Sequence, residues 1–254
     1  MRIRLYINKS VQENAALYYE QAKEARKKRE GLVAAIEQTK KEMAAAEKKQ
    51  KEDKKVVKIK REKRWFEKFH WFTTSEGKLA IGGRSAQQND LVVSKHMEDN
   101  DLFFHADIQG GMVVVLKDGA GASEQELLET AQFAASFSNA WKNGNASVDV
   151  YAVRKDQIGK AVSGGYIPSG AFAISGERRW FRNTRLGLKA GLGESGNSEI
   201  APAISKKELL HQTLLAPSRT GKEKGALAKS LTKKFSVHPD ELLEILPSGK
   251  TKIL

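Results

Sequence analysis

The chain has 254 residues, of which 40% are hydrophobic and 30% are charged, and it contains no cysteine. The missing cysteine excludes disulfides, thiolate catalysis and cysteine-ligated metal centres. No stretch is apolar for the length that a membrane helix needs, and the N-terminus lacks the apolar core of a signal peptide. We therefore expect a cytoplasmic protein without membrane contact.

The net charge of +13 is unevenly distributed. Residues 1–64 contain 20 lysine and arginine residues against 10 aspartate and glutamate residues. The corresponding counts are 14 against 15 for residues 65–194 and 10 against 6 for residues 195–254. Excess positive charge at both flanks of a nearly neutral centre favours a polyanionic partner, of which nucleic acid is the commonest.

The first part, residues 1–64, is predicted as a basic helical stalk. Ser10 and Glu13 have the spacing of a capping box, so the helix is expected to begin there. Apolar residues in steps of four and three form a coiled-coil seam, although several of its positions are alanine. The stalk could pair with a second helix, fold back near Gly31 or stand partly solvated.

A cluster of cations ends the stalk, next to the aromatic residues that open the following domain. A solvated helix face is one interpretation, and contact with phosphates is the other. The position beside the aromatic residues favours phosphate contact, which would supply affinity without reading a sequence. The cluster consists of Lys58, Lys60, Arg61, Lys63 and Arg64.

Residues 65–194 are predicted to form one α+β domain. Helices are expected over residues 85–97 and from the capping box at Ser123 to Trp141. An antiparallel hairpin and an irregular order of elements favour a mixed or antiparallel sheet with packed helices. Apolar or alternating runs predict the strands, over residues 69–74, 78–81, 102–106, 112–116, 147–153 and 170–175, and residues 185–192 are candidates to close the sheet.

Residues 195–254 are predicted as a linker and a small helical tail. Glycine and serine mark residues 193–198 as the linker. Helices are expected over residues 205–215 and 225–235, and Pro239 suits the first position of a short third helix. The last two helices resemble a helix-turn-helix, a pattern that is common by chance, so we expect a packed cap.

Gly82, Gly83 and Arg84 lie between a predicted strand and a predicted helix start. Backbone N–H groups at this position could hold a phosphate with help from Arg84, and the alternative is a tight turn with Arg84 in an ion pair. The amides of Gln88 and Asn89 could bind a base edge or a sugar, or cap neighbouring backbone.

His105 and Asp107 are two residues apart on a predicted strand and so share a face. The pair could be a general acid–base unit, two metal ligands, or a buried network in which Asp107 orients His105. The sequence offers no further ligands and no nucleophile, so we expect neither a metal nor another cofactor. Together with Arg84, the pair supports an alternative function, a hydrolase acting on RNA or a nucleotide.

Residues 177–183 are predicted as an exposed hairpin tip. Arg178, Arg179 and Arg182 surround Trp180 there. Guanidinium groups around an indole suit contact with a nucleic-acid backbone combined with base stacking.

The sequence resembles the NFACT family, and in particular its RNA-binding NFACT-R domain. The preceding coiled coil and the end of the chain are similar to those of archaeal members. The residues that carry the resemblance are 65–69 with Trp71 and Phe72, 81–84 with Ala86 and Asn89, and Asp101 with residues 105–107.

The resemblance implies ribosome-associated quality control, in which family members bind the large ribosomal subunit carrying an obstructed peptidyl-tRNA and extend the nascent chain. That extension is attributed to an N-terminal NFACT-N domain, which this sequence does not resemble. We therefore predict a non-enzymatic RNA-binding protein that contacts rRNA or tRNA on the large subunit, and we leave open a separate NFACT-N-containing partner protein.

Overall fold

The structure of the protein is a computed structural model that describes residues 4–53, 63–160 and 167–254. The chain divides into two units, residues 1–57 and residues 58–254. No helix in the described ranges is long and apolar enough to cross a membrane.

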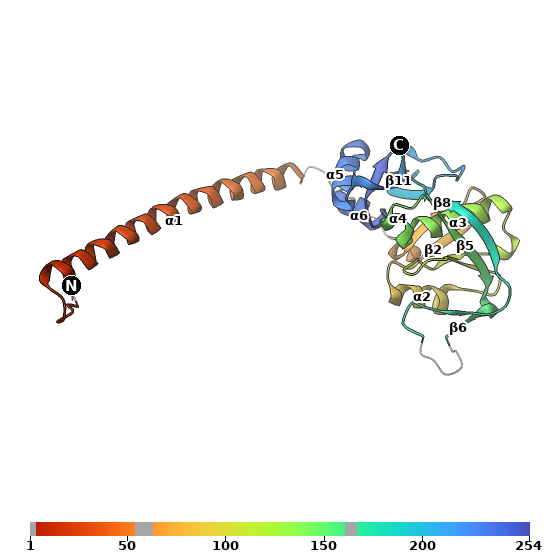
Figure 1. Ribbon diagram of the computed structural model, residues 1–254. Helices are drawn as coiled ribbons and strands as arrows, with labels where there is room; N and C mark the ends of the chain where they lie inside the picture. The colour runs from red at the N-terminus through yellow and green to blue at the C-terminus, as the bar shows by residue number, and fades with distance from the viewer. Residues whose placement is uncertain (1–3, 54–62, 161–166) are drawn as a thin grey trace. The chain divides into compact units, whose positions relative to one another are not determined.

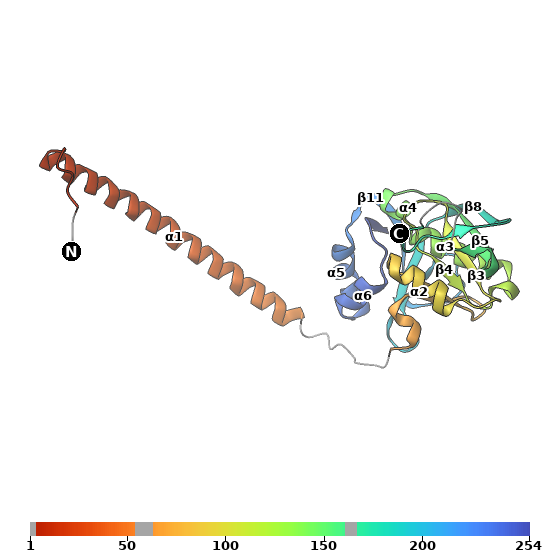
Figure 2. The same cartoon turned by 90° about the horizontal axis from the view of Figure 1, so that it is seen from below.

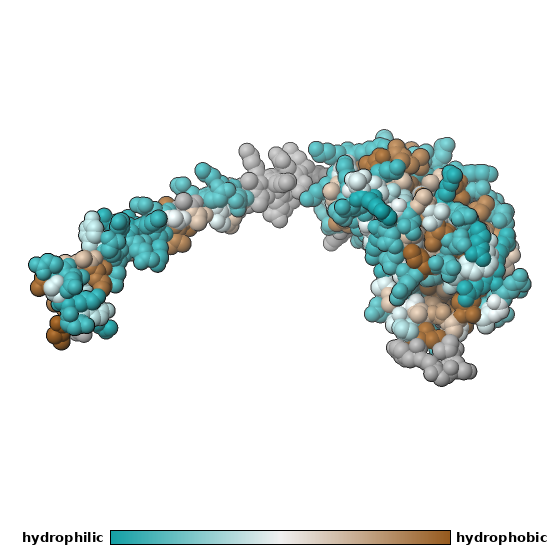
Figure 3. All heavy atoms as spheres, in the orientation of Figure 1, coloured by the Kyte–Doolittle hydropathy of each residue, from teal (hydrophilic) through white to brown (hydrophobic). Residues whose placement is uncertain are grey.

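The first unit contains the helix α1 (Val11–Asp53) of 43 residues. The predicted capping box is confirmed, because Glu13 N–H donates to Ser10 Oγ (3.2 Å) and Ser10 N–H donates to Glu13 Oε2 (2.7 Å). The helix continues through Gly31, so the predicted alternative of a fold-back is wrong. Ile36 and Met43 of the seam are more than half exposed, and Figure 3 shows mainly hydrophilic residues along α1.

The second unit contains a six-stranded sheet in which all neighbouring strands are antiparallel. Its order is β1–β2–β4–β3–β5–β8, so β4, in which all three residues are buried, is an interior strand. The α+β prediction is confirmed (Figures 1 and 2). The strands are β1 (His70–Thr73), β2 (Leu79–Gly82), β3 (Leu102–Ala106), β4 (Val114–Leu116), β5 (Ser147–Arg154) and β8 (Arg179–Arg185).

Each face of this sheet packs against a different helix, because successive side chains of a strand point to opposite faces. Phe103 and Tyr151 belong to the core that contains α2 (Ala86–His96). Phe104 and Phe181 belong to the core that contains α3 (Glu124–Ser136). Figure 1 shows α2 and α3 on opposite faces of the sheet. The face with α2 carries most of the candidate site residues.

Short elements complete this layer. The helix predicted from Ser123 to Trp141 is divided, because α3 ends at Ser136 and a second helix, α4 (Asn139–Asn143), begins after Ser138, which caps it through Oγ. The strand predicted over residues 170–175 is reduced to β7 (Ala173–Ile174), which pairs with β6 (Ile158–Gly159). Single-turn 3-10 helices are η1 (Trp65–Lys68), η2 (Gly119–Gly121) and η3 (Lys155–Gln157).

The C-terminal residues form a second sheet in addition to the predicted helical tail. Its order is β10–β9–β11–β12, with β9 (Leu188–Leu192), β10 (Ser198–Pro202), β11 (Leu210–Lys222) and β12 (Thr251–Ile253). The linker predicted over residues 193–198 is wrong, because Gly193 N–H donates to Asn197 O (2.9 Å) in the turn of the β9–β10 hairpin. Residues 185–192 therefore do not close the first sheet.

The helix predicted over residues 205–215 is also wrong. In β11, Thr213 and Leu215 are buried while Leu214 between them is exposed, which is the two-residue period of a strand. The next two predicted helices are confirmed as α5 (Lys224–Phe235) and α6 (Pro239–Ile245). Their apolar side chains join the same core as α3, so the predicted boundary at residue 194 lies inside one packed body.

Replacement of Gly83 by alanine is expected to destabilise the protein by about 1–3 kcal/mol. A Cβ at Gly83 would lie 2.5 Å from Asn89 N and 2.8 Å from the Gln88 carbonyl carbon, both of which are backbone atoms of α2. Thermal unfolding of Gly83→Ala and of a control, Gly225→Ala, measures this loss of stability. Gly225→Ala is the control, since nothing lies within 4 Å of its added Cβ and helix propensity favours alanine by about 1 kcal/mol. An unchanged midpoint for Gly83→Ala would contradict the packing described.

Candidate nucleic-acid interface

Three aromatic side chains lie in a row across β3, β5 and β8, on the face of the sheet where α2 packs. His105 is the direct partner of Tyr151, and Tyr151 is the direct partner of Trp180. Ring centroids are 6.0 Å apart for His105 and Tyr151, and 5.5 Å apart for Tyr151 and Trp180. Because β8 is an edge strand, this aromatic row (His105, Tyr151 and Trp180) runs inward from the sheet edge.

Two arginines lie over the outer end of the aromatic row. The guanidinium carbon of Arg178 is 4.6 Å from the Tyr151 ring centroid, and that of Arg182 is 3.9 Å from the Trp180 ring centroid. Arg182 also donates to Asp149 (2.6 Å), and this bond is the main cause that lowers the pKa of that carboxyl group. Guanidinium groups held over aromatic rings present flat cationic surfaces on which bases stack.

Arg179 lies on the other face of the same strand. Its guanidinium group is paired with Glu124 of α3, and its neighbour Phe181 is in the core on that side. The predicted hairpin tip over residues 177–183 is therefore wrong, because the segment enters an edge strand and the alternation of the strand separates Arg179 from Arg178 and Arg182. Only the latter two accompany the aromatic row.

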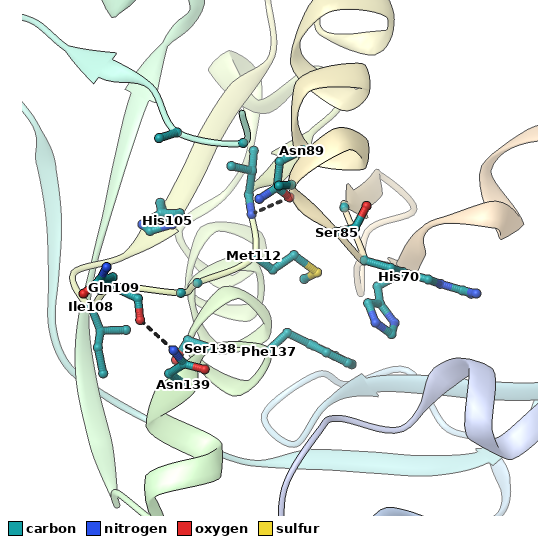
Figure 4. Close-up of a pocket in the computed structure, with 18 of the residues that line it drawn as sticks. His70, Ser85, Asn89, His105, Ile108, Gln109, Met112, Phe137, Ser138 and Asn139 are labelled. Atoms are coloured by element: carbon teal, nitrogen blue, oxygen red, sulfur yellow. Dashed lines mark hydrogen bonds between the residues drawn. The ribbon is translucent and has the colours of Figure 1, made fainter. Parts of the chain in front are cut away.

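A cavity of about 540 Å³ adjoins the inner end of the aromatic row. His105 and Tyr151 form part of its wall, and most of the remainder comes from the start of α2, residues 108–113, the α3–α4 junction and residues 169–172, with His70, Phe103, Lys142 and Ser248. Figure 4 shows His105 and His70 on opposite sides of the cavity.

Positive charge dominates the cavity wall. Arg84 and Lys142 line the cavity, and no aspartate or glutamate does so among the residues that the structure describes. Lys142 is exposed and forms no ion pair with any described residue. The wall therefore favours an anionic ligand over a cationic one.

Arg84 and the predicted amide ligands anchor α2. The Arg84 guanidinium group donates to the carbonyl oxygens of Glu67 (3.2 Å) and Phe69 (3.1 Å). Gln88 accepts from the Arg84 N–H (2.9 Å) and donates to Lys68 O (3.3 Å). These bonds use the groups that a phosphate at the start of α2 would need. Ser85 caps the same turn by accepting from Gln88 N–H.

Asn89 is buried and is also engaged. Its Oδ1 atom accepts from Val113 N–H (3.3 Å), the bond drawn beside Met112 in Figure 4. Asn89 nevertheless lines the cavity, as does Arg84, whereas Gln88 does not. The three residues thus position the cavity wall.

His105 and Asp107 do not form the unit that a hydrolase would need. Asp107 is exposed beyond the end of β3 and does not line the cavity, and no hydrogen bond or ion pair joins it to His105 among the described residues. Burial lowers the pKa of His105, while the backbone of Gly111 and Ala106 and the charge of Asp107 oppose the shift. Arg84 and His105 line the cavity and Asp107 does not, so the three side chains do not converge as the hydrolase alternative requires.

The basic cluster is only partly described. Lys58, Lys60 and Arg61 lie outside the described residues. Lys63 is exposed and paired with Glu244 (2.9 Å), and Arg64 is exposed with its guanidinium carbon 5.9 Å from the Phe66 ring centroid. No group of three or more histidine, aspartate or glutamate side chains could hold a metal ion in the described part of the chain.

His70 is a cavity residue that the sequence did not single out. Its Nδ1 atom is buried without a hydrogen-bond partner among the described residues, and its ring centroid lies 4.3 Å from that of Phe137. Burial lowers the pKa of His70 well below its usual value, and the charges of Arg84 and Lys224 lower it further. The imidazole is therefore neutral at physiological pH. No spacing in the sequence marks it, because its neighbours come from distant segments.

Stability is expected to fall as the pH is lowered from 7 to 5. His70 stays neutral in the folded chain, whereas the unfolded chain takes up a proton below the usual value of about 6.5. The unfolded state then binds more protons, so acid favours unfolding. Burial also lowers the pKa of His96 and His105, which adds to the effect. Denaturant titrations at several pH values measure the slope, and an equal slope in His70→Gln would contradict the assignment to His70.

The chain is similar in sequence to known proteins. Residues 68–176 match the family model described as NFACT protein RNA binding domain. The chain is 40% identical over 206 residues to the archaeal Rqc2 homolog aRqcH of Methanocaldococcus jannaschii, an alignment that covers 78% of this chain and 30% of that protein.

Two animal proteins are also similar in sequence to this chain. The ribosome quality control complex subunit NEMF homolog of Drosophila melanogaster is 35% identical over 185 residues, covering 70% of this chain and 18% of that protein. The human ribosome quality control complex subunit NEMF is 34% identical over 173 residues, covering 66% of this chain and 16% of that protein. The chain thus spans less than a third of the length of these relatives.

Proposed function

Because the chain belongs to the NFACT family and carries the RNA-binding domain of that family, we propose that it binds rRNA or tRNA on the large ribosomal subunit in ribosome-associated quality control. The relatives are named as ribosome quality control proteins, which supports the process. We propose that the six-stranded sheet of the second unit supplies the surface on which RNA is held.

The aromatic row with its two arginines is the observation that carries the proposed surface. Single-stranded RNA is held by stacking of bases on aromatic rings or guanidinium planes and by contacts between cations and phosphates. Arg178 provides both, and Arg182, whose guanidinium group is also bonded to Asp149, provides a second stacking plane, at the edge of the sheet where a strand of RNA has access. β8 lies beyond residues 68–176 but completes the same sheet.

The basic flanks add affinity that does not depend on sequence. Residues 1–64 carry ten more cations than anions. Cations that neutralise phosphates release bound counterions, so binding weakens steeply as salt rises. We propose that Lys58, Lys60, Arg61, Lys63 and Arg64 contribute in this way, with the row supplying the oriented contacts.

Sedimentation with purified ribosomal subunits tests the proposal. At low salt, the chain should pellet with large subunits and not with small subunits, and binding should fall by roughly tenfold or more between 50 and 200 mM salt. Absence of binding to large subunits at the lowest salt would refute the proposed function. Equal binding to both subunits would reduce it to unspecific attraction to rRNA.

Two further parts of the proposal concern the location of the protein in the cell and its partner protein. We propose a cytoplasmic location and a partnership with a separate protein that carries the NFACT-N domain. Fractionation of its own cells measures the location, and co-purification of the tagged chain measures the partnership, since the partner would appear with large subunits. Recovery of the chain with ribosomes but without such a protein would contradict the partnership alone.

A further inference from the structure

We propose that the cavity beside the aromatic row binds one unstacked nucleotide, with the base against its aromatic wall and the phosphate near Lys142. The inference rests on the proposed function, because RNA lying on the row would present the nucleotide. The shared chemistry is a base joined to a phosphate, which either an RNA strand or a free mononucleotide can supply.

The size and the walls of the cavity fit a nucleotide. Its volume of about 540 Å³ lies within the range of roughly 300–1,000 Å³ typical of small-molecule sites. Phe172 lines it together with His105 and Tyr151, and the Phe172 ring centroid is 5.7 Å from that of Phe103. The aromatic rings in the lining provide the stacking surface that an unstacked base requires, and the Lys160 ammonium group lies 4.0 Å from the Phe172 ring centroid.

The charge of the cavity specifies an anionic group beside the base. Lys142 and Arg84 line it and no described carboxylate does. Arg84 is already bonded to two backbone carbonyls, whereas Lys142 has no partner of opposite charge among the described residues. We therefore assign the phosphate to Lys142.

One of the cavity residues carries a buried polar atom without a partner among the described residues. Buried nitrogen atoms in proteins are nearly always hydrogen-bonded. The Nδ1 atom of His70, whose ring lines the cavity, has no such partner among the described residues. Because this atom is closed to solvent, a ligand in the cavity reaches it only if the His70 ring turns, so the assignment rests on the aromatic rings and on Lys142. Neither the family match nor the relatives' names assign a ligand to this cavity.

The cavity and the row are continuous, because His105 and Tyr151 belong to both. A strand of RNA that stacks at Trp180 and Arg182 can therefore place its next or terminal nucleotide inside. Extraction of a base from a duplex costs unstacking energy, so single strands and free ends should be preferred over paired RNA.

Titration calorimetry with AMP, adenosine and inorganic phosphate tests the proposal on the full chain. AMP should bind more tightly than either of its parts. Lys142→Gln should weaken AMP binding about tenfold and leave adenosine binding unchanged, because only the phosphate loses a charged partner. The matched control is Lys95→Gln, an exposed lysine of α2 outside the cavity, which should change neither. AMP binding equal to that of adenosine, or equal losses in both lysine variants, would overturn the assignment.

A second variant tests the aromatic wall. Phe172→Ala should weaken binding of AMP and adenosine alike, by about tenfold, because a base loses its stacking partner. Circular dichroism and the unfolding midpoint show whether the variant is folded. Unaltered adenosine affinity in a folded Phe172→Ala protein would contradict the proposed wall.

Competition experiments distinguish an RNA strand from a free mononucleotide as the source of the bound nucleotide. They also distinguish failure of the cavity proposal from failure of the proposed function. A single-stranded RNA hexamer should displace AMP, and the same hexamer in a duplex should not. Displacement identifies RNA as the source, and AMP binding without displacement identifies a free nucleotide. Sedimentation with large subunits is measured in parallel: retained subunit binding without any AMP binding refutes the cavity alone, and loss of subunit binding refutes the proposed function.

Discussion

Replacement of Trp141 by alanine is expected to lower the free energy of unfolding by about 3–5 kcal/mol. The Trp141 side chain is fully buried in the core that joins both sheets. Its Nε1–H donates to Thr251 Oγ1 (2.9 Å) in β12, so truncation leaves both a large void and an unpaired buried hydroxyl. Since small proteins are stable by only about 5–15 kcal/mol, this loss brings the body close to unfolding. Urea denaturation followed by circular dichroism measures it.

Two further substitutions divide this effect into its causes. Thr251→Val removes the acceptor and keeps most of the volume, and we expect a loss of about 1–3 kcal/mol from the unpaired indole N–H. Trp65→Ala truncates a tryptophan that is 50% exposed, and the loss should be clearly smaller than at Trp141. If Trp141→Ala cost no more than Trp65→Ala, the shared core would not hold β12 as described.

The double substitution Arg178→Gln/Arg182→Gln is expected to weaken binding to single-stranded RNA by about tenfold to a hundredfold. Both guanidinium groups lie over rings of the aromatic row, so their removal takes away two stacking planes and two cations. The slope of log affinity against log salt should become shallower by at most about 1.4, since each phosphate contact on a single strand contributes about 0.7. Fluorescence anisotropy with a labelled oligonucleotide at several salt concentrations gives both quantities.

Arg179→Gln is the matched control for this double variant. It removes one positive charge, half of what the double variant removes, from the opposite face of β8, where the guanidinium group is paired with Glu124. Its effect on RNA affinity should be less than threefold, since it touches neither the row nor the cavity. A loss in the control that is half as large, in log affinity, as the loss in the double variant would show that these arginines act only through their net charge.

Much of the fold could be predicted from local patterns. The capping boxes at Ser10 and Ser123 and the alternating runs of β1, β3 and β5 are determined by neighbouring residues, and all are confirmed. The errors in predicted secondary structure concentrate after residue 185, where tertiary contacts determine whether a segment forms a helix or a strand. The segment 210–215 carries both a helical and a strand pattern, and pairing with β9 and β12 makes it a strand.

The candidate site was less accessible to sequence reasoning. Arg178 and Arg182 were identified from the motif around Trp180, although the tip expected there is an edge strand. Tyr151, Phe172, His70 and Lys142 were not identified, because they come from separate segments that only the tertiary fold brings to one row and one cavity. The family resemblance predicted from the sequence is confirmed by the matched domain and the relatives.

Electron cryomicroscopy of the full chain on the large ribosomal subunit tests the central claim most directly. We predict RNA density against Arg178, Trp180 and Arg182, on the face of the six-stranded sheet where α2 packs. A bound complex in which this face contacts only protein or solvent, while RNA lies elsewhere on the body, would contradict it.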